Sequence, residues 1–398
     1  MPKINYQLFF KLVLILTLLK ILFSIYFGDE LIDMEWGKIN QNLIKYGEYS
    51  YHEIDGTRVP NIYMPPLYPY FLYLFSLIGL DQLITTKLIL SVQCILSSIS
   101  TFIFYKILTN YFDEQKSYII SFLYFTFPIN FYAASQISSV NIQVFCFIYF
   151  LYYLLNLRTF KDFILLGLFS AFLILVRGEF WLLFLVIIIF KILTNIKLTK
   201  YYLTTFFITL LIISPILIKN YKIFDKIVIT KSFGYNLWRG NSEDLNINGN
   251  FYDFKGFNNN FLNSGEDINK FELYMDNYFL EKAKENLVQD PYKYITHYFK
   301  KFFAFSVFNY DSNYPNYFNP LVFIPEIIIS VFAILGIINN FFKNRDYEIL
   351  ILIFYYLALI PIFFVLPRYK LFILPLYFIF ASQFYFSLKQ YFFKKTVN

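Results

Sequence analysis

The sequence predicts an all-α polytopic membrane protein with about ten spans. Of its 398 residues, 58% are hydrophobic and only 15% are charged, whereas soluble domains contain about 25% charged residues. Long apolar segments recur along the whole chain, and a spanning helix needs about 20 apolar residues. We therefore expect spans near residues 8–27, 83–106, 118–135, 139–157, 162–177, 179–195, 202–219, 319–341, 347–366 and 370–390.

The distribution of cations predicts how these spans are oriented. The 34 Lys and Arg residues exceed the 27 Asp and Glu residues by seven. With the N-terminus inside, every short inner loop receives a cation, as the positive-inside rule requires. The basic balance therefore reflects topology, and we expect a lipid bilayer and no nucleic acid as partner. The inner cations are Lys3, Lys11, Lys106, Lys116, Arg158, Lys161, Lys197, Lys200, Lys343, Arg345, Lys389, Lys394 and Lys395.

The chain divides into three parts: a membrane module at 1–219, an extracytoplasmic segment at 220–318, and C-terminal membrane helices at 319–398. We call residues 220–318 the outer segment. It begins with two short β-like runs and an Asn- and Gly-rich loop, and a helical stretch follows at 267–289. Its apolar positions are too few for a large core of its own, so we expect it to cover the outer ends of the membrane helices.

The first outer loop, residues 28–82, carries the densest group of acids. Asp29, Glu30, Asp33 and Glu35 lie where the chain leaves the first span. An amphipathic pattern at 36–46 predicts a helix on the membrane surface. A polar turn around Asp55 and Gly56 comes next.

The loop ends in a second helix. Pro65 and Pro66 stop any preceding helix and redirect the chain. The apolar run at 67–80 is too short to cross the bilayer, so we expect a second juxtamembrane helix.

Asp33 is the main catalytic candidate. Its structural interpretation is a helix cap at the membrane surface. Its functional interpretation is a general base that takes a proton from an attacking hydroxyl, because several acids cluster there against the bilayer.

Arg368 is the second candidate, because it is a cation on the outer side. It is either a snorkelling anchor or a bidentate phosphate ligand. Lys370 and Arg58 are further candidates for binding phosphate. Arg177 and Glu179 are expected to pair with each other.

Aromatic and proline residues near these charges are candidates for a substrate pocket. For Tyr63, Tyr68 and Tyr70, the alternative interpretation is that they are tyrosines of the membrane interface. No Gly-rich phosphate loop, Ser-His-Asp order or HExxH pattern is present, and a nucleotide-sugar domain is missing. The pocket candidates are Tyr63, Pro65, Pro66, Tyr68, Trp238 and Arg239.

Four stretches in order resemble a known enzyme family. They are the acidic loop with INQNLIKYGEYS and VPNIYMPPLYPYFLYLF, then SPILIKNYKIFDKIVITKSFGYNLWRGNS, then ENLVQDPYKYITHYFKKFF, and PRYKLFILPLYF. From about residue 8 to 385 the chain resembles GT-C glycosyltransferases, and most closely glycosyltransferase family 39. This family comprises dolichyl-phosphate-mannose protein mannosyltransferase-like enzymes, including lipid A aminoarabinose transferases.

The resemblance implies a GT-C fold and inverting sugar transfer from a polyprenyl-phosphate donor on the outer face. The acceptor is a glycolipid, polysaccharide or protein, and the implied location is the bacterial inner membrane with the site facing the periplasm. The family's first-loop carboxylate corresponds to Asp33, with Glu35 as the alternative. The family's phosphate-side arginine corresponds to Arg368.

Two departures from the family pattern matter. Lys219 stands where the family has an arginine at the start of its long loop. The family's second outer acid falls in SQISSVNIQ, where Asn141 is the nearest polar residue. A family metal would lose a ligand there. His52 and His297 lie far apart, and Cys94 and Cys146 lie in apolar runs, so we expect no metal and no other cofactor.

Two other functions remain open. A flippase or transporter for lipid-linked sugars would also need aromatic and cationic groups in a cavity, although the chain lacks the repeats typical of transporters. An O-antigen polymerase or ligase would act on similar lipids, with a much larger outer loop and paired arginines.

Overall fold

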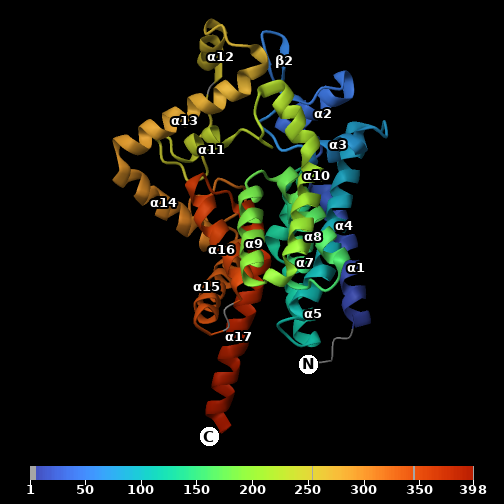
Figure 1. Ribbon diagram of the computed structural model, residues 1–398. Helices are drawn as coiled ribbons and strands as arrows, with labels where there is room; N and C mark the ends of the chain where they lie inside the picture. Colours follow the sequence, from blue (N-terminus) through green and yellow to red (C-terminus); the bar gives the residue numbers. More distant parts are fainter. Residues whose placement is uncertain (1–5, 253, 344–345, 398) are drawn as a thin grey trace.

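The computed structural model describes residues 6–252, 254–343 and 346–397, and over these it is almost entirely helical. Figure 1 shows a bundle of helices, with a smaller group of helices on its upper side. The start of α1 and the end of α17 both lie at the lower end of the bundle. Two of the predicted inner cations, Lys3 and Arg345, lie outside the described residues.

The bundle confirms the predicted all-α membrane class. Among the described residues, four helices are long and apolar enough to cross a bilayer: Tyr6–Phe27, Gln82–Leu108, Ile196–Phe224 and Pro320–Phe341. Others are apolar but shorter, so helix length alone does not fix the number of spans. The bundle helices are α1 (Tyr6–Phe27), α4 (Gln82–Leu108), α5 (Glu114–Phe125), α6 (Pro128–Ala134), α7 (Val140–Leu155), α8 (Phe160–Val176), α9 (Phe180–Thr194), η1 (Ile196–Leu198), α10 (Thr199–Phe224), α15 (Pro320–Lys343), α16 (Tyr347–Leu359) and α17 (Leu374–Val397).

The predicted span at 118–135 is two helices, α5 and α6, and not one. The break lies at Phe127, which has an extended backbone with ψ 130°. Pro128 follows it, and proline disfavours the helical conformation of the residue before it. Pro128 then becomes the first residue of α6, where its missing N–H costs nothing.

The predicted spans at 347–366 and 370–390 also change at their facing ends. Helix α16 ends at Leu359, and two short 3-10 helices follow, η3 (Ile360–Ile362) and η4 (Pro367–Phe372). Pro361 and Pro367 lie in their first turns and prevent a continuous α-helix. This irregular stretch carries Arg368 to the upper end of the bundle.

The first outer loop confirms both predicted juxtamembrane helices, α2 (Met34–Tyr46) and α3 (Leu67–Ser76). Between them, β1 (Ser50–Ile54) and β2 (Thr57–Pro60) form an antiparallel hairpin. The predicted turn lies at its tip, where Asp55 and Gly56 both have positive φ. The sequence pattern did not predict the two strands.

The outer segment contains helices and no strand among its described residues. It comprises α11 (Phe233–Gly240), α12 (Phe254–Asn263), η2 (Ile268–Lys270), α13 (Phe271–Gln289) and α14 (Pro291–Ser306). The predicted β-like runs are therefore wrong. Val228 and Ile229 belong to no strand, and the Asn220 amide donates to both of their backbone carbonyls, at 2.8 and 3.1 Å.

A buried carboxylate joins the outer segment to the first outer loop. Glu272 on α13 is fully buried. Its Oε2 accepts the backbone N–H groups of Ile62 and Tyr63 at 2.6 and 2.7 Å, and its Oε1 lies 2.7 Å from His52 Nδ1. Charge-assisted hydrogen bonds of this kind are about twice as strong as neutral ones. Glu272 therefore fixes the position of α13 against the loop that leads into α3.

We expect Glu272→Ala to lower the free energy of unfolding by about 3 kcal/mol or more, because it leaves several buried donors without an acceptor. Unfolding can be followed by SDS titration in mixed micelles. Glu285→Ala on the exposed side of α13 is the control, and we expect it to change stability by less than about 0.5 kcal/mol. Equal stability of the two variants would contradict the role assigned to Glu272.

Candidate active site

A cavity of about 1440 Å³ lies where the upper ends of the bundle helices, the first outer loop and the outer segment meet. Pockets for one small ligand are about 300–1,000 Å³. This cavity is therefore large enough for two substrates side by side. Its walls include parts of the segments 29–36, 51–65, 132–139, 176–181, 227–254, 313–315 and 359–372.

Asp29 is held at the cavity wall directly after α1. Its backbone N–H donates to Ser135 O at 3.0 Å, and its carboxylate Oδ2 accepts the N–H of Ile137 at 2.7 Å. Gly28 permits this approach, because a Cβ there would lie 2.4 Å from Ser24 O. Burial raises the pKa of Asp29 above its usual range, and the nearby charge of Asp33 adds to the rise.

Asp33 and Glu35 also line the cavity, in agreement with their selection from the sequence. Asp33 occupies the N-cap position of α2, but its side chain makes no capping hydrogen bond. The carboxylate of Asp33 is exposed to the cavity and is not used by the helix, which argues against the interpretation of Asp33 as a cap. Glu35 lies in the first turn of α2 and is half-buried.

Arg368 faces the acids from η4. Its Nε is buried and has no hydrogen-bond partner among the described residues, where Arg368 also has no ion pair. Its charge interacts with Glu35, Tyr132 and Tyr314, and the rings of these two tyrosines are in contact at 6.0 Å. A buried N–H donor without an acceptor is costly, so the position of Nε favours a bound anion.

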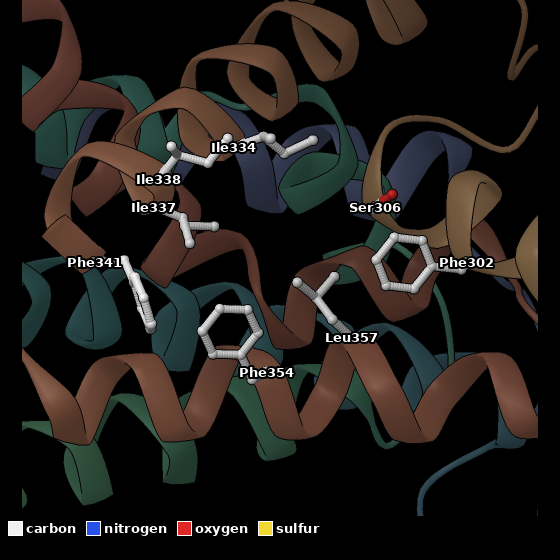
Figure 2. A pocket seen from close by; sticks show the side chains of 8 residues that line it. All are labelled: Phe302, Ser306, Ile334, Ile337, Ile338, Phe341, Phe354 and Leu357. Atoms are coloured by element: carbon white, nitrogen blue, oxygen red, sulfur yellow. The ribbon is translucent and has the colours of Figure 1, made fainter.

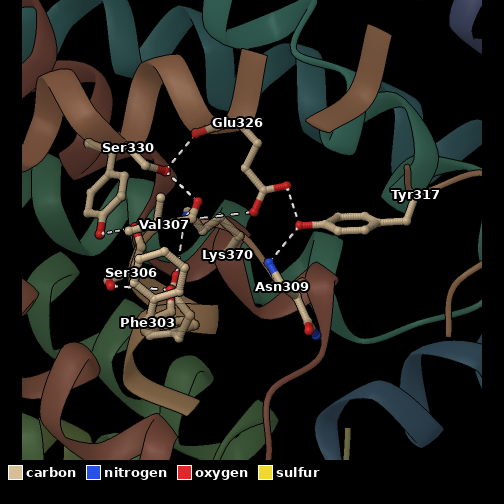
Figure 3. A network of polar contacts seen from close by, with 10 residues as sticks. Phe303, Ser306, Val307, Asn309, Tyr317, Glu326, Ser330 and Lys370 are labelled. Atoms are coloured by element: carbon tan, nitrogen blue, oxygen red, sulfur yellow. Dashed lines mark hydrogen bonds and ion pairs between the residues drawn. The ribbon is translucent and has the colours of Figure 1, made fainter. Parts of the chain in front are cut away.

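Lys370 does not line the cavity, so its predicted contact with phosphate has no support in the structure. Figure 3 shows its ammonium among backbone carbonyls at the end of α14. It donates to Phe305 O, Ser306 O and Val307 O at 3.0, 2.9 and 2.8 Å. It also pairs with Glu326 at 3.7 Å. Lys370 thereby satisfies helix-terminal carbonyls that would otherwise lack donors.

Arg177 is a further charged group of the cavity wall, between α8 and α9. It was expected to pair with Glu179, but its Nε donates to Gln143 Oε1 at 3.0 Å. Its guanidinium lies over the rings of Tyr369 and Phe372, 5.3 and 5.0 Å from their centroids. Arg177 therefore contacts the same 3-10 helix that carries Arg368.

A buried lysine fixes the outer segment to this region. Lys301 on α14 is fully buried. Its ammonium donates to Gly240 O at 2.8 Å, to Asn241 Oδ1 at 3.1 Å and to Phe363 O at 2.6 Å. The end of α11 and the stretch between η3 and η4 are thus bound to one charge.

The pocket candidates divide into two groups. Tyr63, Pro65 and Arg239 line the cavity. The side chains of Pro66, Tyr68 and Trp238 are not part of its lining. Tyr68 is buried and donates to Gln93 Oε1 at 3.2 Å.

Arg58 and Trp238 have other partners. Arg58 pairs with Glu48 on the hairpin and lies over the ring of Tyr46, 3.6 Å from its centroid. Its predicted contact with donor phosphate therefore has no support. Trp238 packs on Phe279 and Tyr252 in a separate aromatic cluster of the outer segment.

A second pocket of about 400 Å³ lies away from these charges. Figure 2 shows its lining, which is apolar except for Ser306 and comes from α14, α15 and α16. It contains no acid and no cation, so it has no group for acid–base chemistry or phosphate binding.

The described residues contain no group of three or more His, Cys, Asp or Glu side chains placed to hold a metal ion. In the stretch SQISSVNIQ, where the family has its second acid, Ser138 and Ser139 line the cavity. Asn141 is buried, and its amide donates to Ala133 O at 2.6 Å. Asn141 is therefore not part of the cavity lining.

Sequence reasoning missed two residues of the wall. Asp29 was seen in the acidic cluster but not selected, although it lies closest to the end of α1. Arg177 was assigned to an ion pair. The signal for both was their position directly after an apolar run that ends on the outer side.

Comparisons with known proteins agree with this architecture. Residues 63–218 match a family model described as dolichyl-phosphate-mannose-protein mannosyltransferase. No curated protein sequence matches the chain. The structure is similar to that of an Archaeoglobus fulgidus oligosaccharyltransferase tethered to an acceptor peptide with the NVT sequon, with a TM-score of 0.53 and 15% identity over 94% of this chain and 49% of that one.

A second structure of the archaeal oligosaccharyltransferase AglB from Archaeoglobus fulgidus, with an inhibitory peptide and a dolichol-phosphate, gives a TM-score of 0.53 and 13% identity. The match covers 97% of this chain and 52% of AglB. The chain thus spans about half the length of the solved structures it matches. These comparisons confirm the GT-C fold and the resemblance to the mannosyltransferase family.

Because the Asp33 side chain does not cap α2, we expect Asp33→Ala to leave the free energy of unfolding within about 0.5 kcal/mol of wild type. Asp81→Ala is the matched control: Asp81 caps α4 by accepting the N–H of Leu83 at 3.0 Å, and we expect a loss of about 1 kcal/mol. SDS-titration unfolding of both variants measures the difference. A loss at Asp33 as large as that at Asp81 would restore the cap interpretation.

Proposed function

We propose that this chain is a membrane glycosyltransferase that moves a hexosyl or pentosyl group from a polyprenyl-phosphate donor to an acceptor, with inversion, on the extracytoplasmic face. One observation carries the proposal. A carboxylate that its helix does not use, Asp33, and a guanidinium without a described partner, Arg368, face the same cavity at one end of a membrane bundle.

Asp33 is the proposed general base. In the reaction, the acceptor hydroxyl or amine attacks the anomeric carbon of the donor sugar and gives its proton to the Asp33 carboxylate. A positioned base of this kind contributes about 10²–10⁴ in rate. Asp29 lines the same cavity and adds a second carboxylate to its wall. A single displacement by the acceptor inverts the anomeric configuration.

Arg368 is the proposed ligand of the leaving group. As the new bond forms, the bond between the anomeric carbon and the phosphate oxygen breaks, and the polyprenyl phosphate leaves with the electron pair. A guanidinium can bind two phosphate oxygens at once. Arg177, between α8 and α9, lies over two rings of the same 3-10 helix and adds positive charge. Preorganised cations at the developing negative charge stabilise the transition state.

Three observations support a lipid-linked donor. The family model matched by residues 63–218 is described by a dolichyl-phosphate sugar, and AglB has been solved with a dolichol-phosphate. The cavity opens at the end of a bundle whose helices are apolar enough to lie in a bilayer. A carrier lipid in the bilayer can therefore present its phosphate to η4 without leaving the membrane.

The location of the cavity on the outer face is proposed from the distribution of Lys and Arg residues. The inner loops hold most short-loop cations, and the cavity lies at the opposite end of the bundle. In a bacterial cell this places the cavity at the periplasmic side of the inner membrane. The acceptor is then a glycolipid, polysaccharide or protein of the cell envelope.

We expect Asp33→Asn to lower sugar transfer by about 10²–10⁴, because the amide cannot accept the proton. Transfer is measured by mass spectrometry of glycolipids and glycoproteins in a deletion strain that carries each variant. Glu30→Gln is the control, since Glu30 is an exposed acid of the same loop outside the cavity lining. Normal transfer by Asp33→Asn would overturn the assignment of the base, and lipid-linked sugar that crosses the membrane without transfer would favour a flippase.

We expect Arg368→Gln to raise the donor concentration needed for half-maximal rate by about 10- to 100-fold, because a charged hydrogen bond to phosphate contributes about 1.5–3 kcal/mol. The measurement is the rate of transfer against donor concentration in nanodiscs. Arg58→Gln, an exposed arginine away from the cavity, should leave this dependence unchanged. Unchanged dependence in Arg368→Gln would exclude Arg368 as the phosphate ligand.

A further inference from the structure

A third arginine lines the cavity from the outer segment. Arg239 lies at the end of α11, in the outer segment, whereas Arg368 and Arg177 come from the bundle. Figure 1 shows α11 next to α13 in the group of helices on the upper side of the bundle. The outer segment and the bundle therefore present separate positive charges to the same cavity.

The guanidinium of Arg239 is held in a fixed position. Its Nε donates to Asn250 O at 3.1 Å. Its Cζ lies 4.4 Å from the ring centroid of Phe251 and 4.3 Å from that of Phe364. A cation between two aromatic faces is stabilised and loses rotamer freedom before any ligand arrives.

The backbone beneath Arg239 is equally constrained. A Cβ on the next residue, Gly240, would lie 1.8 Å from Phe363 O. Lys301 donates to the carbonyls of both Gly240 and Phe363. The N–H of Val365 also donates to Ile247 O at 2.8 Å. Arg239 is therefore built on a rigid junction and not on a loose loop.

The contacts of Arg239 leave its charge available. Within residues 6–252, 254–343 and 346–397, it has no ion pair, and no hydrogen bond uses its two terminal nitrogens. These nitrogens carry four N–H donors in a planar fork that matches a carboxylate or a phosphate. A purely structural role of Arg239 would need the stacked rings and the Nε hydrogen bond, but it would not need the remaining donors to face a cavity.

The donor phosphate is not the natural ligand for this charge. In the proposed reaction the donor phosphate binds Arg368, beside Arg177 of the bundle. Arg239 belongs to the outer segment and remains for the second substrate. In the proposed reaction that is the acceptor.

We propose that Arg239 binds a carboxylate or phosphate group on the acceptor, so that the enzyme prefers anionic acceptors over their neutral analogues. That the ligand is the acceptor rests on the proposed function. The anion-binding site at Arg239 does not depend on it. The subsite lies in the same cavity as Asp33, so an acceptor anchored there can direct a hydroxyl toward the base.

The test is binding of small sugars to the full chain in nanodiscs without donor. Trp36 and Trp181 line the cavity and Trp238 precedes Arg239, so intrinsic tryptophan fluorescence reports occupancy. The probes are methyl glucuronide, glucose 6-phosphate and the neutral methyl glucoside. We expect at least one anionic probe to bind about tenfold tighter than methyl glucoside, and the tighter of the two identifies the anion as carboxylate or phosphate.

Variants assign the preference to a residue. We expect Arg239→Gln to abolish the preference for the anionic probe, Arg239→Lys to keep part of it, and Arg368→Gln to keep it. Phe251→Leu changes an exposed ring and should reduce the preference about threefold while the protein stays folded. No preference in the wild type, a preference that survives in Arg239→Gln, or one lost in Arg368→Gln alone would overturn the proposal.

The outcome is separate from that of the proposed function. Binding is measured without transfer, so an anion preference that depends on Arg239 stands even if no sugar transfer is found. In the reverse case, transfer that depends on Asp33 without any anion preference leaves the glycosyltransferase proposal intact and removes only the subsite.

Discussion

The site depends on one buried ammonium group. Lys301 holds Gly240, Asn241 and Phe363 together through three oxygen atoms. Through these contacts the outer segment and the stretch before η4 keep one relative position. A lysine is suited to this task because its three donors can reach three acceptors from different segments. A hydrophobic contact of the same size would not set their directions.

Buried charge is used here in two different ways. Glu272, Lys301 and Lys370 are surrounded by donors or acceptors of the opposite kind, which offset part of the cost of burial, and each fixes a junction. Arg368 differs, because the described residues give its buried Nε no partner. The protein thus tolerates an unsatisfied charge at one place in the cavity wall, where a substrate can satisfy it.

The sequence predicted the parts of the fold that follow from hydropathy and spacing. The amphipathic pattern at 36–46 gave α2, and the Pro65–Pro66 pair gave the start of α3. The β-like run around Val228 forms no strand, and the side chain of Asn220, eight residues away, donates to its carbonyls. Strand propensity does not show which side chain will take these hydrogen bonds.

The candidate site was predicted in part for the same reason. Asp33 and Arg368 could be selected because each breaks the pattern of its neighbourhood, an acid at a membrane exit and a cation on the outer side. Lys370 breaks that pattern too, yet its ammonium turns to the end of α14. The direction of a side chain depends on tertiary packing, which neither composition nor spacing reveals.

The family match covers residues 63–218, and neither Asp33 nor Arg368 lies within it. The shared sequence is therefore mainly the helical scaffold and one side of the cavity. Tyr63, Pro65 and Arg177 are the wall residues discussed above that fall inside the match. Substrate choice in a shared scaffold can diverge through the remaining walls, which come from the outer segment and η4.

The walls of the cavity have a consequence for how the protein is made. Asp29 follows the first helix, and Arg368 precedes the last one, so their meeting closes a loop that contains most of the chain. Contacts between such distant positions form late, because the entropy of closing the loop must be overcome first. The helices can insert one after another before the cavity is complete. The complete cavity therefore forms only in the last step of folding.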